Sequence, residues 1–233
     1  MKDNKLTFDK DAIKIKQHFE IKLLADIKKV IKGSGWRKKI ATLTKEFENN
    51  FYCLHIDAKY PQKGVKLTLK TKPMALDELF WEISGMPENK LEPLSFRTWG
   101  WFTCSSIKID QISFDDEVST LKLAKKILLW SNNAIEKHHK TSFNKKFSTL
   151  VKKDLEQINN SQHAITLITS LIVEKSYKEA MYLAKQYDSG KLQSGLTFIL
   201  NDKSYFFHVI KWINKKEKLP NFISKIIRKI KEI

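Results

Sequence analysis

The sequence predicts an α+β protein, with an N-terminal antiparallel sheet and a packed helix, followed by an all-helical C-terminal half. Three observations predict this fold class. Apolar residues recur at helical spacing near the N-terminus, strand-like segments follow between residues 37 and 109, and helical spacing returns beyond residue 113. We therefore expect two domains, a sheet domain over residues 1–112 and a helical bundle over residues 113–233.

The N-terminal elements follow from periodicity and turn residues. Apolar residues at spacings of three and four predict a helix over residues 11–32, which Gly33 and Gly35 can close in the left-handed conformation. Alternation and β-favouring residues predict strands over residues 37–43, 51–60 and 65–70. The last two are joined by a short connection with two turn formers, which indicates a hairpin.

The next segment is rich in aromatic residues. A short helix is expected over residues 76–83, and β-favouring aromatic, Thr and Ser residues predict a fourth strand over residues 96–109. Asp115 and Asp116 supply negative charge at the start of a helix that runs to about residue 136. Further helices are predicted over residues 143–158, 163–173, 177–187 and 222–233, while residues 198–212 are ambiguous.

The composition and net charge limit which functions the chain can have. The 233 residues are 42% hydrophobic, which is enough for a sizeable core, and carry 43 Lys and Arg against 26 Asp and Glu, a net charge of +17. Such a field attracts nucleic acid, anionic membrane or an acidic protein. With neither a secretion signal nor a transmembrane segment visible, we expect a cytoplasmic protein in which Cys53 and Cys104 stay reduced.

A short motif links the N-terminal part to a known family. Gly35, Trp36, Lys38 and Lys39 stand between the first helix and the first strand, ahead of an Asn-Phe-Tyr strand, a hairpin and an aromatic strand. Over residues 10–112 this order resembles a family of small bacterial domains of unknown function, family 4304. The resemblance implies a fold and no catalytic residues. It also implies a class, because some relatives look like immunity proteins in bacterial toxin loci.

No pattern in the sequence assembles an active site. Cys53, His55 and Asp57 share one face of a predicted strand, but side chains two residues apart lie about 6.6 Å from one another, too far for a nucleophile and its base. The histidines lack the spacing of a metal site, and no phosphate-binding loop is present. We therefore expect no catalytic residues, no cofactor and no metal site.

The basic and aromatic residues of the sheet are the candidate partner-binding surface. Alternation places three lysines on one face of the third strand and an arginine with two tryptophans on one face of the fourth: Lys66, Lys70, Lys72, Arg97, Trp99 and Trp101. Such a surface can attract acidic groups and stack bases. In the alternative interpretation, the tryptophans form a core-facing row under the first helix.

The C-terminal residues 222–233 form an amphipathic basic pattern, with Phe and Ile on one side and Lys and Arg mostly on the other. We expect this helix to dock on the bundle through its isoleucines. In the alternative interpretations, the helix lies on an anionic membrane or binds in the groove of a partner protein.

Together these observations predict a non-catalytic bacterial interaction protein, most specifically an immunity-type protein that binds and neutralises an acidic toxin partner. The alternative is a basic nucleic-acid-binding accessory protein, which the net charge of +17 supports. A hydrolase or nuclease is a third class, because catalytic residues scattered through a fold escape spacing arguments.

Overall fold

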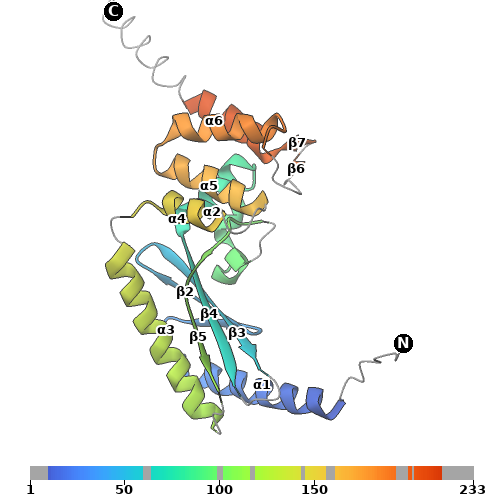
Figure 1. The fold of residues 1–233 in the computed structure, drawn as a ribbon, viewed down its shortest axis with the longest axis vertical. Helices are drawn as coiled ribbons and strands as arrows, with labels where there is room; N and C mark the ends of the chain where they lie inside the picture. The colour runs from blue at the N-terminus through green and yellow to red at the C-terminus, as the bar shows by residue number, and fades with distance from the viewer. Residues whose placement is uncertain are drawn as a thin grey trace, which may run out of the picture. The chain divides into compact units, whose positions relative to one another are not determined.

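The computed structural model describes residues 10–59, 64–98, 102–115, 119–142, 145–155, 161–192, 199–200 and 202–216. It confirms the α+β class, with a five-stranded antiparallel sheet and helices in the N-terminal part and helices beyond it (Figure 1). The chain divides into two compact units. Unit 1 comprises Met1–Thr71 and Lys108–Asn144, and unit 2 comprises Lys72–Ile107 and Lys145–Ile233.

This division differs from the expected break at residue 113. After residue 107 the chain returns to the sheet as its last strand and then forms the long helix α3 (Thr120–Ser142), which belongs to unit 1. Each unit is therefore built from two separate stretches of chain. A single cut in the sequence cannot separate them.

Unit 1 contains nearly all of the sheet and two helices on one of its faces. The strands lie in the order β1 (Arg37–Lys39), β2 (Thr42–Phe47), β3 (Asn50–Ala58), β4 (Val65–Pro73) and β5 (Ile107–Phe114). Residues of α1 (Lys10–Val30) and of α3 pack with those of the sheet in one core, which includes Leu23, Ile27, Leu43, Leu54, Leu67, Leu123 and Ile127. The face that carries Leu43, Leu54 and Leu67 is the inner face.

The expected strand over residues 37–43 is in fact a hairpin. Arg37 lies opposite Thr44 and Lys39 opposite Thr42, and the chain turns at Ile40 and Ala41. Ile40 adopts φ 54°, a conformation that glycine favours and a β-branched residue rarely takes. Because this turn contains no Gly, Pro, Asn or Asp, its sequence resembles that of a continuing strand.

The expected strand over residues 96–109 is also wrong. Leu94–Thr98 is a 3-10 helix, η2, and the strand β5 occupies Ile107–Phe114 instead. The ring of Phe96 lies 6.0 Å from that of Trp81 and 6.2 Å from that of Phe102, between ring centroids. Contacts between aromatic rings around Trp81 thus set the conformation near Phe96. Strand propensity takes no account of such contacts.

Unit 2 is mainly helical. Its elements are α2 (Met74–Ile83), η1 (Pro87–Leu91), η2, α4 (Phe147–Leu155), α5 (Ser161–Val173), α6 (Tyr177–Asp188), the paired strands β6 (Ile199–Leu200) and β7 (Lys203–Ser204), and a helical segment over residues 205–216. The ambiguous segment is thus a small hairpin that leads into a helix. The expected helix over residues 222–233 lies outside the described residues. Among the described helices, none is both long and apolar enough to cross a membrane.

Candidate functional site

Two of the expected partner-binding residues lie inside unit 2. Lys72 has no exposed surface and Arg97 is 6% exposed, so neither contributes to a cationic surface as the sequence predicted. Both contact the same carboxylate, that of Asp77, which is itself fully buried. Asp77 is on α2, five residues beyond Lys72, and no sequence motif marks it as their partner.

The buried lysine has every donor used. Lys72 Nζ donates to Asp77 Oδ1 at 2.9 Å, to the carbonyl oxygen of Arg97 at 2.8 Å and to that of Cys104 at 2.6 Å. The backbone N–H of Cys104 donates to the same Asp77 oxygen at 2.8 Å. A buried charge persists only when it is paired and hydrogen-bonded, and this network meets that requirement. Lys72 therefore has a structural role.

Arg97 joins the network from η2. Its guanidinium donates to Asp77 Oδ2 at 3.1 Å and to the carbonyl oxygen of Met74 at 3.0 Å. The guanidinium carbon also lies 4.8 Å from the ring centroid of Trp81, a cation–π contact. These contacts hold the segment after α2 against the helix. Trp99 and Trp101, expected to share the face of Arg97, lie outside the described residues.

Lys66 and Lys70 lie on the sheet in unit 1, where alternation along β4 separates them from the core. Val65, Leu67 and Leu69 are buried on the inner face, whereas Lys66 and Lys70 are half-buried and point the other way. We call this opposite side the outer face. α1 and α3 both pack on the inner face.

Further cations share the outer face with the two lysines. Arg37 and Lys39 are exposed and lie opposite Thr44 and Thr42, which alternate with the buried Leu43. Lys108 is exposed on β5 next to Ile109, which packs against the core. These five side chains form what we call the basic sheet face: Arg37, Lys39, Lys66, Lys70 and Lys108. The sequence pattern predicted two of them.

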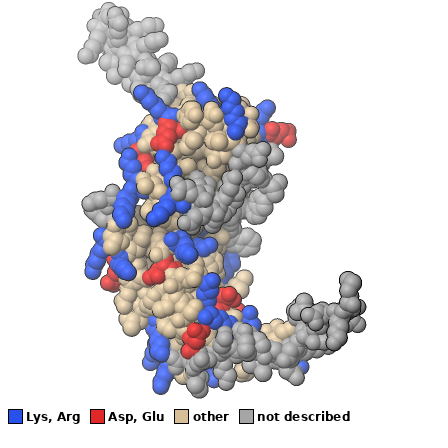
Figure 2. Space-filling model, viewed as in Figure 1, with Lys and Arg blue, Asp and Glu red and all other residues tan. Residues whose placement is uncertain are grey.

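Acidic side chains are interspersed with this group. By the same alternation, Glu46 and Asp57 also lie on the outer face, where the five cations outnumber them. His55 adds a titratable group. Figure 2 shows Lys and Arg spread over the visible surface of both units, with fewer Asp and Glu among them. The outer face therefore carries charges of both signs, with cations in excess.

Cys53 and His55 lie closer together than the sequence argument predicted. The Sγ atom of Cys53 is 3.4 Å from Nε2 of His55, so the expectation that side chains two residues apart cannot meet is wrong here. Side chains in a strand can lean along its direction, so two of them two residues apart can come closer than the backbone rise alone would set. Cys53 is only 2% exposed, however, and a nucleophile has to be reached by its substrate.

The environment of His55 disfavours its protonated form. Partial burial, and then the positive charge of Lys70, lower the pKa of His55 below its ordinary value. A neutral imidazole ring nitrogen can accept the weak S–H donor of Cys53. The contact therefore ties two adjacent outer-face residues together. Within the described ranges, the His, Cys, Asp and Glu side chains form no group of three that could hold a metal ion.

Comparison with known proteins finds no matching family model, no similar curated protein and no similar solved structure. The resemblance of residues 10–112 to family 4304 therefore stays a prediction.

Proposed function

We propose that the chain is a non-catalytic interaction protein that binds an acidic partner on the basic sheet face. In its most specific form, the proposal is that of an immunity-type protein whose partner is an acidic toxin. The observation that carries it is the placement of five Lys and Arg residues, from β1, β4 and β5, on the face opposite the helices. A hydrogen-bonded sheet holds these charges at fixed spacing, as specific recognition requires.

The interspersed acids favour a protein over nucleic acid. Glu46 is exposed on β2 and Asp57 is exposed on β3, and each would repel a phosphate that passes close to it. The surface of an acidic protein also carries some Lys and Arg, which can pair with these carboxylates. Complementary charge of this kind raises the association rate and suppresses wrong partners.

Nucleic acid is the second candidate, favoured by the net charge of +17. Base stacking receives no support from the described outer face, because its aromatic residue, Phe51, is fully buried. Binding would then depend on phosphate contacts alone. Such binding weakens steeply with salt.

Charge reversal on the basic sheet face tests the proposal. The variant Lys66→Glu/Lys70→Glu is compared with Lys122→Glu/Lys125→Glu, which alters the exposed side of α3 and changes the net charge equally. The probes are poly-L-glutamate and a short single-stranded DNA, each titrated at two salt concentrations. We expect the first variant to bind poly-L-glutamate about tenfold more weakly, since surface pairs contribute up to about 1 kcal/mol each. The control should keep its affinity.

Equal losses in both variants would show that only the total charge matters and would overturn the proposal. If the first variant loses affinity for DNA while poly-L-glutamate binds neither variant nor the wild type, the nucleic-acid function replaces the protein-binding one.

A further inference from the structure

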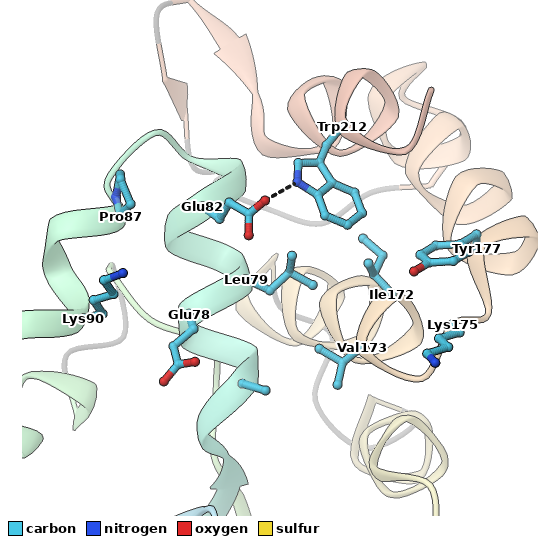
Figure 3. A pocket seen from close by; sticks show the side chains of 11 residues that line it. Glu78, Leu79, Glu82, Pro87, Lys90, Ile172, Val173, Lys175, Tyr177 and Trp212 are labelled. Carbon is cyan, nitrogen blue, oxygen red and sulfur yellow. Dashed lines mark hydrogen bonds between the residues drawn. The ribbon is translucent and has the colours of Figure 1, made fainter. Parts of the chain in front are cut away.

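Unit 2 contains a groove of about 470 Å³ that is lined by both apolar and charged side chains (Figure 3). Its apolar lining includes Leu79 from α2, Ile172 and Val173 from the end of α5, Tyr177 from the start of α6 and Trp212 from the helical segment 205–216. In Figure 3 these side chains approach the same hollow from three sides. Val173 is 37% exposed, so part of the lining faces solvent. Exposed apolar side chains that line a groove mark a place where another apolar surface can bind.

Charged side chains lie along the groove. Glu78 and Glu82 line it from α2, and Lys90 and Lys175 line it elsewhere. Trp212 Nε1 donates to Glu82 Oε1 at 3.0 Å, which orients the indole (Figure 3). The α2 side is thus acidic, and it suits an occupant with an apolar stripe and a basic flank.

The chain itself carries such an occupant in residues 222–233, which lie outside the described residues. Their apolar side chains recur at spacings of three and four, namely Phe222, Ile223, Ile226, Ile227, Ile230 and Ile233. Lys225, Arg228, Lys229 and Lys231 lie mostly on the other side. As a helix, these twelve residues would extend about 18 Å.

The place where the described chain ends brings this segment close to the groove. The described part of the helical segment that contains Trp212 reaches Lys216, one turn further on, and Lys216 Nζ lies 5.0 Å from the Trp212 ring centroid. Only residues 217–221 intervene before Phe222, and a five-residue connection spans up to about 17 Å. Pro220 lies in this connection, and proline disfavours a helix that continues through it. A tether this short gives the segment an effective concentration in the millimolar range.

We propose that residues 222–233 form an amphipathic helix that occupies this groove, with the isoleucines against Leu79, Ile172 and Val173 and basic side chains toward Glu78 and Glu82. The inference is independent of the partner bound by unit 1. The groove is then part of the folding core of unit 2.

Disulfide trapping in the full-length chain tests the placement. Val173→Cys is combined in turn with Ile223→Cys, Ile226→Cys and Ile230→Cys, while the native Cys53 and Cys104 are both buried. The matched control replaces Val173→Cys by Tyr182→Cys, because Tyr182 is 62% exposed on α6 outside the groove. At least one groove pair should form an intramolecular disulfide about tenfold faster than its control, since bridging needs the Cα atoms within about 7 Å.

Amide hydrogen exchange of the full-length protein gives an independent readout. We expect residues 223–233 to exchange at least about tenfold more slowly than an unstructured segment. Ile226→Ser/Ile230→Ser should abolish this protection, and the matched variant Lys225→Ser/Lys229→Ser should retain it. Equal disulfide rates in groove and control pairs, with unprotected amides, would overturn the proposal. So would isoleucine-dependent binding to phosphatidylserine vesicles without any loss of thermal stability in the isoleucine variant, which would identify a membrane anchor.

Discussion

Lys72 and Asp77 form an ion pair in which neither side chain has any exposed surface, with 2.9 Å between Nζ and the carboxylate. Arg97 shares the same carboxylate, so one acid compensates two buried cations. Removing the acid leaves Lys72 without a counter-charge and Arg97 with only its contact to Glu78, which costs far more than an exposed pair contributes.

We therefore expect Asp77→Asn to lower the free energy of unfolding by about 3 to 5 kcal/mol. The substitution keeps the size of the side chain and removes its charge. Chemical denaturation followed by circular dichroism measures the change. Glu78→Gln is the control, because the Glu78 side chain is 52% exposed and contacts Arg97 only from the edge of the network. Glu78→Gln should lower the free energy of unfolding by about 1 kcal/mol or less. Equal effects of the two substitutions would contradict the assigned role of Asp77.

Because the thiol of Cys104 is buried, we expect the free energy of unfolding to fall at alkaline pH. Burial, and then the negative charge of Asp77, raise the pKa of Cys104 from its ordinary 9.0 to about 12. Above pH 9 the unfolded chain releases this proton while the folded protein keeps it. Stability is therefore full below about pH 9 and falls as the pH rises toward 12.

Between about pH 8 and pH 10 this group should account for a loss of about 1 kcal/mol. Urea midpoints of the wild type and Cys104→Ala at the two pH values measure it. The alanine variant should show a smaller decrease, because it lacks the thiol while Tyr205, whose pKa burial also raises, is present in both proteins. Identical decreases would show that Cys104 does not titrate in this way.

The pKa of His55 should depend on a neighbouring lysine. The positive charge of Lys70 is the second cause, after burial, that lowers this pKa. Lys70→Met should therefore raise the pKa of His55, and Lys66→Met should change it less, since Lys66 is not among the causes. Titration of the imidazole protons by NMR measures both.

The lowered pKa of His55 also has a consequence for folding. Its contribution to stability is complete above the ordinary pKa of 6.5 and is lost as the pH falls below that value, because the unfolded chain binds the proton first. His55→Gln should reduce the acid sensitivity of unfolding between neutral and mildly acidic pH. An unchanged pH profile in this variant would contradict the assignment.

Ile40 carries local strain at the tip of the first hairpin. Its φ of 54° costs roughly 1 to 2 kcal/mol in an L-residue, and its side chain is 79% exposed, so little packing offsets that cost. Ile40→Gly should raise the melting temperature, with a gain of roughly 1 kcal/mol after the entropy of glycine is included. Ile40→Val keeps the branched side chain and should leave the melting temperature unchanged. A lower melting temperature for Ile40→Gly would show that the side chain packs favourably.

Local periodicity by itself determined several elements. The helix that became α1 is periodic over many residues, and Gly33 and Gly35, at φ 75° and 79°, end it as predicted. Periodicity also predicted α5 and α6, which are joined by a tight turn at Lys175, whose φ is 62°. The hairpin of β3 and β4 follows from alternation and turn residues. In each case the signal lies within neighbouring residues, where propensity and patterning act.

The sequence also determined that Lys66 and Lys70 share one side of a strand, since alternation is a property of the backbone. Only the tertiary structure decided that Lys72, two residues further, is buried, because its burial depends on Asp77 from α2 and on the carbonyl oxygens of Arg97 and Cys104. In the same way, the membership of α3 in unit 1 depends on packing against α1 and the sheet, which are distant in sequence. Charge and period are local properties of a chain. Which charges become neutralised in the interior is decided by contacts between segments, and no spacing rule records those contacts.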